Sequence, residues 1–418
     1  MKKGEIQATL AEKLVARAAG RSSVTPGEIV TCKVDLAMMH DSGGPRRVKP
    51  MLERLGAKVW DPSKVVVITD HYVPTYDDES RKIIRIARDW VREAGIHNFY
   101  DEQGICHVVL PERGHLRPGM FAVGGDSHSP TGGAFAAYMF GVGATEMLGV
   151  LVTGEIWLKV PHTIAMDFAG RLQAGVSAKD IMLFLIGKFG LDGGKYQAVE
   201  YRGAAIRALP MQERMTLCNM TAELGGQTGL IASDETTATF LKTRTEPWDS
   251  DPDARLMAHH RFDAPALAPQ VAAPHSPANS RAASEFNDVT PSVAYIGACT
   301  GAKLADLHMA ASVLKGRQAK MRLMVAPASA RDLKAAEDDG TLKVLEEAGS
   351  EFLGLGCGIC AGYGGKVLGD NVVAISTTAR NFKGRMGAAS SQVYLASPYT
   401  VAATAAAGRI CDPREFLQ

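Results

Sequence analysis

Short stretches rich in β-branched residues alternate along the chain with segments of helical periodicity. Residues 64–69 (KVVVIT) have the Val/Ile content of a buried parallel strand, and residues 80–93 carry apolar side chains at helical spacing before Gly95. Further strands are predicted at 107–110 and at 120–123. This strand–helix rhythm favours a parallel sheet, in which functional side chains gather at the carboxyl ends of the strands. We therefore expect an α/β fold.

Length and charge exclude several classes of protein. The 418 residues are 46% hydrophobic, and a formal net charge of +1 gives no support to an electrostatic nucleic-acid binder. The longest apolar run, residues 181–186, is far shorter than the roughly 18 residues of a membrane span. Residues 1–20 lack an apolar leader region and are expected to form an amphipathic helix. We expect a cytoplasmic protein that binds neither nucleic acid nor membrane.

Composition marks two domain boundaries. Residues 143–159 (GATEMLGVLVTGEIWLK) have a helical pattern that stops at Val160-Pro161. Residues 261–284 are rich in Ala and Pro, which is typical of a linker. Between these boundaries, Ser177 and Asp180 have the spacing of a capping box at the start of an apolar helix. The chain is thereby divided into three parts.

The cysteines predict a metal site. Seven cysteines in a chain without a secretion signal favour metal binding or simple burial over a disulfide framework. Cys357 and Cys360 stand at CxxC spacing within LGCGICAGYGG, and two small core residues are the plain alternative. A zinc site would need a second such pair, and a thioredoxin-like redox pair would lack the flanking glycines. Together with Cys299, in YIGACTGAK, they suit a 4Fe–4S cluster in which one iron has no protein sulfur.

Histidines and carboxylates stand together at predicted strand ends. Asp70-His71 follows the first predicted strand, His107 lies in GICH, and Asp126-Ser127-His128 lies in GGDSHSPTGGAF. A single histidine is usually a structural residue. Three of them in glycine-containing loops indicate proton transfer, because histidine titrates near neutral pH and a neighbouring carboxylate can select its tautomer.

Two further pairs are weak signals by themselves. Asn219 and Glu223 are four residues apart and would share one face of a helix, where such residues are usually solvated. Arg380 and Arg385 lie on a glycine-containing loop and could hold a di- or tricarboxylate through bidentate contacts. Two exposed surface arginines are the plain alternative.

The ensemble of motifs resembles the aconitase superfamily, and it is most similar to the stand-alone large subunits of 3-isopropylmalate dehydratase and homoaconitase. The similar blocks follow the family's order along nearly the whole chain: MMHDSGGP, DHYVPT, GICHVVLPE, GGDSHSPTGGAF, LCNMTAELGGQTGL, IGACTG, GCGIC, RNFKGRMG and YLASPYTVAATAAAGRICDPREF. The resemblance implies three α/β domains with mostly parallel sheets around a central iron–sulfur cleft, at 1–161, 162–285 and 286–418. It also implies that the fourth, swivelling domain is absent.

The resemblance assigns a role to each candidate residue. It implies one 4Fe–4S cluster with one open iron, ligated by Cys299, Cys357 and Cys360. The implied catalytic groups are acid–base residues around the cluster, namely His71 with Asp70, His107 with Asp126, and His128 with Glu223. The implied substrate-binding groups are Arg380, Arg385, His40, Ser127 and Asn219.

The implied reaction is reversible dehydration and rehydration of a 2-hydroxy di- or tricarboxylic acid, as in leucine biosynthesis. Isopropylmalate, homocitrate or homoaconitate, dimethylmalate, citramalate and maleate-type acids all fit this chemistry. A separate small, swivelling subunit would supply a serine base, so the chain alone should be inactive. A non-catalytic relative that binds or senses iron is the alternative from another class, and a structural zinc protein is a third.

Four positions depart from the family's pattern near the expected iron site. Ala298 and Gly301 flank the first cysteine where the family has Ser and Asn, Ile359 replaces a proline, and Ala379 replaces an Asn. The lost polar groups would tune cluster potential and affinity, so cluster stability or substrate is expected to differ. The pair Arg46-Arg47 is also unusual and could bind an extra carboxylate.

Overall fold

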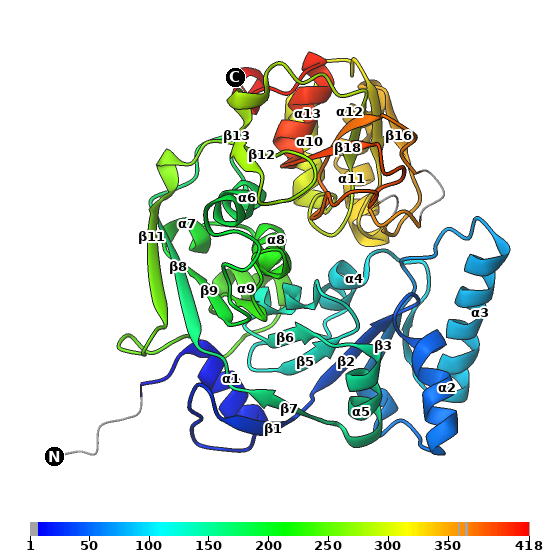
Figure 1. Ribbon diagram of the computed structural model, residues 1–418, viewed down its shortest axis with the longest axis vertical. Helices are drawn as coiled ribbons and strands as arrows, with labels where there is room; N and C mark the ends of the chain where they lie inside the picture. Colours follow the sequence, from blue (N-terminus) through cyan, green and yellow to red (C-terminus); the bar gives the residue numbers. More distant parts are fainter. Residues whose placement is uncertain (1–6, 358–359, 364–366, 418) are drawn as a thin grey trace.

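The computed structural model describes residues 7–357, 360–363 and 367–417, and its sheets are mostly parallel. In Figure 1, a five-stranded sheet lies at the lower right, a four-stranded sheet at the left and a seven-stranded sheet at the top. A two-stranded antiparallel ribbon, β1 (Ile29–Lys33) with β7 (Glu155–Lys159), completes the strands. The predicted α/β class with mostly parallel sheets is confirmed.

The five-stranded sheet is parallel throughout. Its order is β4 (Asn98–Tyr100), β3 (Val65–Ile68), β2 (Leu36–His40), β5 (Phe121–Gly124) and β6 (Tyr138–Gly141). Alternate residues of one strand enter different cores: Met38 and Val66 pack on one face, whereas Met39 and Val67 pack on the other. A strand buried on both faces needs a continuous apolar run, which explains the predicted strand at 64–69.

The predicted strand at 107–110 is wrong, because these residues lie in helix α4 (Cys106–Glu112). A run of only three apolar residues, 108–110, does not distinguish a buried strand from a buried helix. Here the carboxylate Oδ2 of Asp70 accepts a hydrogen bond of 2.7 Å from the backbone N–H of Cys106, in the first turn. That bond satisfies a helix N-terminal donor and directs α4 toward the end of β3.

The four-stranded sheet is also parallel and carries the helices beside the candidate site. Its order is β10 (Thr228–Leu230), β9 (Ala198–Arg202), β8 (Thr163–Ala169) and β11 (Ala258–Asp263). The predicted capping box is confirmed, since Ser177 and Asp180 bond reciprocally at the start of α6 (Ala178–Phe189). Residues 143–159, predicted as one helical pattern, divide at Gly154 into α5 (Ala144–Thr153) and strand β7.

The seven-stranded sheet takes two strands from the segment predicted as a linker. Its order is β13 (Ser280–Ala282), β12 (Gln270–Ala272), β18 (Gln392–Ala396), β17 (Val373–Ser376), β14 (Val293–Ile296), β15 (Arg322–Val325) and β16 (Ser350–Phe352). The Ala/Pro-rich segment therefore contains two short antiparallel strands, of which β12 pairs with β18 and β13 pairs with β12. The domain limits at 161 and 285 stay predictions.

Helices cover the sheets. Their bounds are α1 (Leu10–Ala18), α2 (Pro45–Leu55), α3 (Asp78–Glu93), α7 (Ala204–Arg207), α8 (Met211–Asn219), α9 (Glu235–Leu241), α10 (Leu304–Leu314), α11 (Ala330–Asp338), α12 (Thr341–Glu347) and α13 (Pro398–Ala407). The predicted N-terminal amphipathic helix corresponds to α1, which Thr9 and Glu12 cap reciprocally. Across the described ranges, each helix is too short or too polar to span a bilayer.

Candidate active site

Most predicted site residues line one cavity of about 260 Å³. It lies where the carboxyl ends of β2, β3 and β5 face those of β14, β16 and β17. Twelve predicted residues line it: His40, Asp70, His71, His107, Asp126, Ser127, His128, Cys299, Cys357, Cys360, Arg380 and Arg385. Asn219 and Glu223 lie behind this lining and are buried. A larger hollow, of about 640 Å³ beside β6 and β7, contains none of these residues.

Asp70 holds His71 in the cavity wall. His71 Nδ1 lies 2.6 Å from Asp70 Oδ1, and its ring stacks on His40 with centroids 4.2 Å apart. Burial opposes a charged imidazole, but the Asp70 carboxylate and the nearby Cys357 outweigh it and raise the pKa of His71 well above its usual value. The pKa of Asp70 is lowered in turn, because His71 outweighs burial. The Asp70 carboxylate therefore favours the protonated form of His71.

Asp41 orients this segment, and sequence reasoning missed it. Its Oδ1 accepts hydrogen bonds of 3.1 Å from the backbone N–H groups of Asp70 and His71, and its Oδ2 accepts one of 2.6 Å from Tyr72. The signal was present, since Asp41 directly follows His40 at the end of β2. One carboxylate thus fixes the backbone of the turn that carries the imidazole.

A second imidazole–carboxylate pair joins α4 to the loop after β5. His107 Nε2 lies 2.9 Å from Asp126 Oδ1. The distance is that of an ion pair, although the alignment does not meet hydrogen-bond geometry. Burial would raise the pKa of Asp126, but His107 and the other histidines near it lower that pKa well below its usual value. Asp126 is therefore a carboxylate.

Glu223 links the third pair to an arginine. Its Oε1 lies 2.9 Å from His128 Nε2 and accepts a hydrogen bond of 2.5 Å from Arg380 Nε. Arg380 also donates to Ser127 Oγ at 2.8 Å. Burial lowers the pKa of His128, whereas His128 and Arg380 together outweigh burial and lower the pKa of Glu223. Glu223 follows the turn after α8, and from there its carboxylate reaches both His128 and Arg380.

The three cysteines fit a cluster better than a single ion. Cys299 and Cys360 are buried, all three thiols are free, and all three line the cavity. Sulfurs on one tetrahedral zinc would lie about 3.8 Å apart. The described chain has two groups of potential ligand atoms within 4.8 Å of one another, and neither contains these cysteines. The wider spacing suits separate iron corners, and Ile359 lies outside the described residues.

Buried polar atoms beside the cysteines also suit a bound group. Asn219 donates to Thr131 Oγ1 at 2.8 Å, and its side chain also hydrogen-bonds Cys299. The Oδ1 of Asn219 and the Oε2 of Glu223 are buried without a hydrogen-bond partner among the described residues. Unsatisfied buried acceptors are costly, so a water or hydroxyl group that donates to them would relieve that cost. The aconitase family implies a 4Fe–4S cluster, and the donor set present here fits one.

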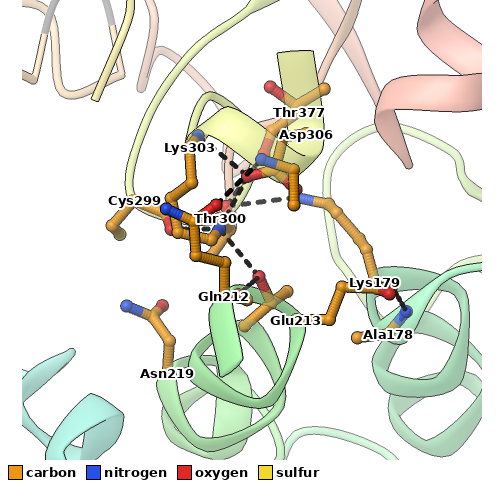
Figure 2. A network of polar contacts seen from close by, with 12 residues as sticks. Ala178, Lys179, Gln212, Glu213, Asn219, Cys299, Thr300, Lys303, Asp306 and Thr377 are labelled. Atoms are coloured by element: carbon orange, nitrogen blue, oxygen red, sulfur yellow. Dashed lines mark hydrogen bonds and ion pairs between the residues drawn. The ribbon is translucent and has the colours of Figure 1, made fainter. Parts of the chain in front are cut away.

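Two buried lysines hold the loops that carry Cys299 and Arg380, and sequence reasoning missed both. Lys303 Nζ donates to the Cys299 carbonyl at 2.9 Å, to Thr216 at 3.0 Å and to Asp306 at 2.7 Å. Lys179 Nζ donates to Thr300, Thr377 and Thr378, and burial lowers the pKa of Lys179 to about 7. Figure 2 shows both side chains meeting at the Cys299 loop from opposite sides.

The structure gives a reason for one departure from the family's pattern. A Cβ on Gly301 would lie 2.1 Å from Thr377 Cβ, so only glycine fits against this threonine. Ala298 has φ 69°, a left-handed conformation that costs a residue with Cβ roughly 1 kcal/mol. Ala379 is buried, and nothing in the structure explains its replacement of a polar residue.

Comparison with known proteins agrees with this geometry. The sequence matches the Aconitase family (aconitate hydratase) over residues 12–290 and 279–408. It is 43% identical over 416 residues to the 3-isopropylmalate dehydratase large subunit 1 of Methanopyrus kandleri, covering 98% of this chain and 99% of the relative. It is 46% identical over 388 residues to the probable methanogen homoaconitase large subunit of Methanosarcina mazei, covering 92% and 99%.

A solved structure shares the fold. The holo form of aconitase X from Thermococcus kodakaraensis superposes with a TM-score of 0.52 at 13% identity, covering 84% of each chain. The predicted resemblance is confirmed. The chain belongs to the aconitase family and is a hydro-lyase of that family.

Proposed function

We propose that this chain is the catalytic large subunit of an iron–sulfur dehydratase that removes water from a 2-hydroxy di- or tricarboxylic acid and adds it back. One observation carries the proposal. Three free cysteines, three imidazole–carboxylate pairs and two arginines belong to a single cavity and its wall. A hydro-lyase needs this combination, because it must bind carboxylates, move protons and activate a hydroxyl.

The cluster would be held by Cys299, Cys357 and Cys360, which leaves one iron without a protein ligand. When bound, a cluster with an open iron supplies a Lewis acid for the substrate's carboxylate and hydroxyl. Burial raises the pKa of Cys357 to about 12, so this thiol is protonated until a metal displaces the proton. Loading is therefore expected to release protons.

His71 is proposed as the acid. The Asp70 carboxylate accepts a hydrogen bond from His71 Nδ1, which leaves the Nε2 proton of the protonated ring for the departing hydroxyl. Proton donation to a leaving group contributes roughly 10²–10⁴-fold to such reactions. Asp41 keeps the backbone of this turn in place, which keeps His71 aimed into the cavity.

The arginines are proposed to bind substrate carboxylates. Arg385 lines the cavity with its Nε buried and without a hydrogen-bond partner among the described residues. Arg380 is oriented by Glu223 and Ser127, which leaves part of its guanidinium for a ligand. Two imidazole–carboxylate pairs are proposed to transfer protons to and from the substrate and water, namely His107 with Asp126 and His128 with Glu223. His40 and Asn219 are proposed to complete the binding site.

A small subunit is the proposed partner. Both curated relatives are called large subunits, which implies a small subunit for those proteins. We propose that an equivalent subunit closes this cavity and supplies a serine base. A cytoplasmic location stays a prediction from the sequence.

The test is an anaerobic assay of the cluster-loaded chain with its small subunit. The assay follows loss of the conjugated double bond as the unsaturated partners of isopropylmalate, homocitrate, dimethylmalate and citramalate, and maleate itself, are hydrated. Hydration of at least one acid, absent without the small subunit, supports the proposal. Full cluster loading without hydration of any acid would instead favour the non-catalytic, iron-binding alternative.

A further inference from the structure

Two adjacent arginines begin helix α2, and only one of them has a partner. Arg46 and Arg47 lie in the first turn, which contains no acidic residue. Cations there oppose the helix dipole, whose positive end is at the N-terminus. Arg46 Nε donates to the Ser42 carbonyl at 2.8 Å, and its guanidinium lies 5.3 Å from the centre of the Tyr72 ring. Arg47 is exposed, and its guanidinium has no hydrogen bond or ion pair with any residue that the structure describes.

Arg47 lines the candidate active-site cavity, whereas Arg46 does not. The first turn of a helix favours anionic side chains, so a cation without a partner is unfavourable there. Residues that break such a local rule are often found at functional sites. An anionic ligand would relieve this conflict, because it would meet both the guanidinium and the positive end of α2.

His40 provides an independent observation at the same place. The backbone N–H of Gly43 donates to His40 Nδ1 at 3.4 Å, so a neutral ring carries its proton on Nε2. His40 is 3% exposed, and its Nε2 is buried without a hydrogen-bond partner in the described chain. The Asp126 carboxylate is 3.7 Å away, beyond hydrogen-bond distance. This buried N–H donor lines the cavity together with Arg47.

Two arginines without an ion-pair partner among the described residues therefore line the cavity, and they follow strands of different sheets. Arg385 follows β17 of the seven-stranded sheet, and Arg47 follows β2 of the five-stranded sheet. The lining contains little to hold a branched alkyl group, since Ile105 is its one Val, Leu or Ile side chain among the described residues and is 1% exposed. The side of the cavity next to β2 thus favours an anion over an isopropyl group.

We propose that Arg47, with the N–H of His40, forms a subsite for a third carboxylate, remote from the two that Arg380 and Arg385 bind. The substrate is then a tricarboxylic hydroxy acid, and a 2-alkylmalate is disfavoured. This inference rests on the proposed dehydratase function and deepens it. Arg47 is a specificity-determining residue that acts by direct contact with the substrate.

The experiment compares two unreactive probes, propane-1,2,3-tricarboxylate and succinate, on the cluster-loaded complex with the small subunit. Calorimetric titration of the wild type should show tighter binding of the tricarboxylate. Arg47→Met should weaken tricarboxylate binding by about 10- to 100-fold, because charge-assisted contacts are lost. The same substitution should leave succinate binding within about twofold. Arg46→Met is the matched control, since it removes an adjacent charge outside the cavity, and both affinities should stay within about twofold.

Equal weakening of both probes by Arg47→Met, no weakening of either, or equal binding of both probes to the wild type would overturn the proposal. Arg47→Lys tests folding, because it keeps the charge and should retain part of the tricarboxylate preference. The hydration assay distinguishes failure of the Arg47 subsite from failure of the dehydratase function. Activity on alkylmalates without probe discrimination would remove the subsite alone, whereas probe discrimination without hydration of any acid would remove the dehydratase function alone.

Discussion

The Nζ of Lys303 donates a hydrogen bond of 2.9 Å to the carbonyl oxygen of Cys299. Lys303 is completely buried, and Asp306 balances its charge at 2.7 Å. The ammonium thus connects the start of α10 to the backbone of the cysteine that precedes it in the same loop. The shape of the proposed cluster loop therefore depends on a residue that does not touch the cavity.

Substitution of Lys303 tests this relationship. Lys303→Met should lower the melting temperature and reduce iron retention, because it leaves the Asp306 carboxylate and the Cys299 carbonyl unpaired inside the protein. Breaking a buried ion pair costs roughly 3–5 kcal/mol. The measurements are thermal unfolding and iron content after reconstitution, and Lys188→Met, an exposed lysine in the last turn of α6, is the control.

A second variant separates stability from cluster retention. Lys303→Met with Asp306→Leu removes both charges and should recover part of the melting temperature, since the Asp306 carboxylate is no longer left without Lys303. Recovery stays partial because Asp306 also favours the charge of the buried Lys179. It should not recover iron retention, because the Cys299 carbonyl still lacks its donor. Normal iron content in either variant would show that Lys303 serves folding alone.

Glu223 should be required for catalysis because it orients two cavity residues at once. Glu223→Gln replaces the carboxylate that pairs with His128 and accepts from Arg380. We expect kcat to fall by roughly 10²–10⁴-fold, with iron content preserved. Steady-state rates and iron analysis of the complex measure this. Glu235→Gln on α9, an exposed carboxylate, should behave like wild type. A Glu223→Gln variant with unchanged kcat would exclude the proposed role.

Glu112 should make stability depend on pH. Burial and then Asp332 raise the pKa of Glu112 to about 7, while Ser329 Oγ donates to it at 2.8 Å. With the folded pKa above the unfolded value, the folded state binds the extra proton. The resulting stability is present below about pH 4.5 and is lost as pH rises through about 7.

The measurement for Glu112 is the difference in melting temperature between wild type and Glu112→Gln from pH 5 to pH 8. Relative to the wild type, the variant should gain about 1–3 kcal/mol between these limits, because it never carries the buried charge. Glu155→Gln, at an exposed position in β7, should show no such trend. A constant difference across the range would mean that Glu112 titrates normally.

The sequence brings its candidate residues to one cavity where they follow parallel strands, as His71 follows β3 and Cys299 follows β14, and their roles stay predictions. In such folds the strand order alone brings these ends together. It predicts α4 wrongly, because His107 and the three apolar residues after it fit a buried strand or a buried helix equally. The bond from Cys106 N–H to Asp70 favours the helix.

Other site features could not be predicted because they depend on groups distant in sequence. Lys179 and Lys303 satisfy backbone carbonyls of loops that lie beside them only in the folded chain, 198 residues away for Lys179 and Thr377. Gly301 is explained only by the position of Thr377. Hydrophobic periodicity carries no information on such pairings.

The central claim is that three cysteines hold one cluster in this cavity. The most direct measurement is iron per chain, with the iron–sulfur absorbance band, after anaerobic reconstitution of wild type, Cys299→Ser and the control Cys32→Ala in β1. We predict about four irons in wild type and control, and a loss of the band in Cys299→Ser. An iron-free wild type, or a Cys299→Ser variant that keeps its full cluster, would contradict the account.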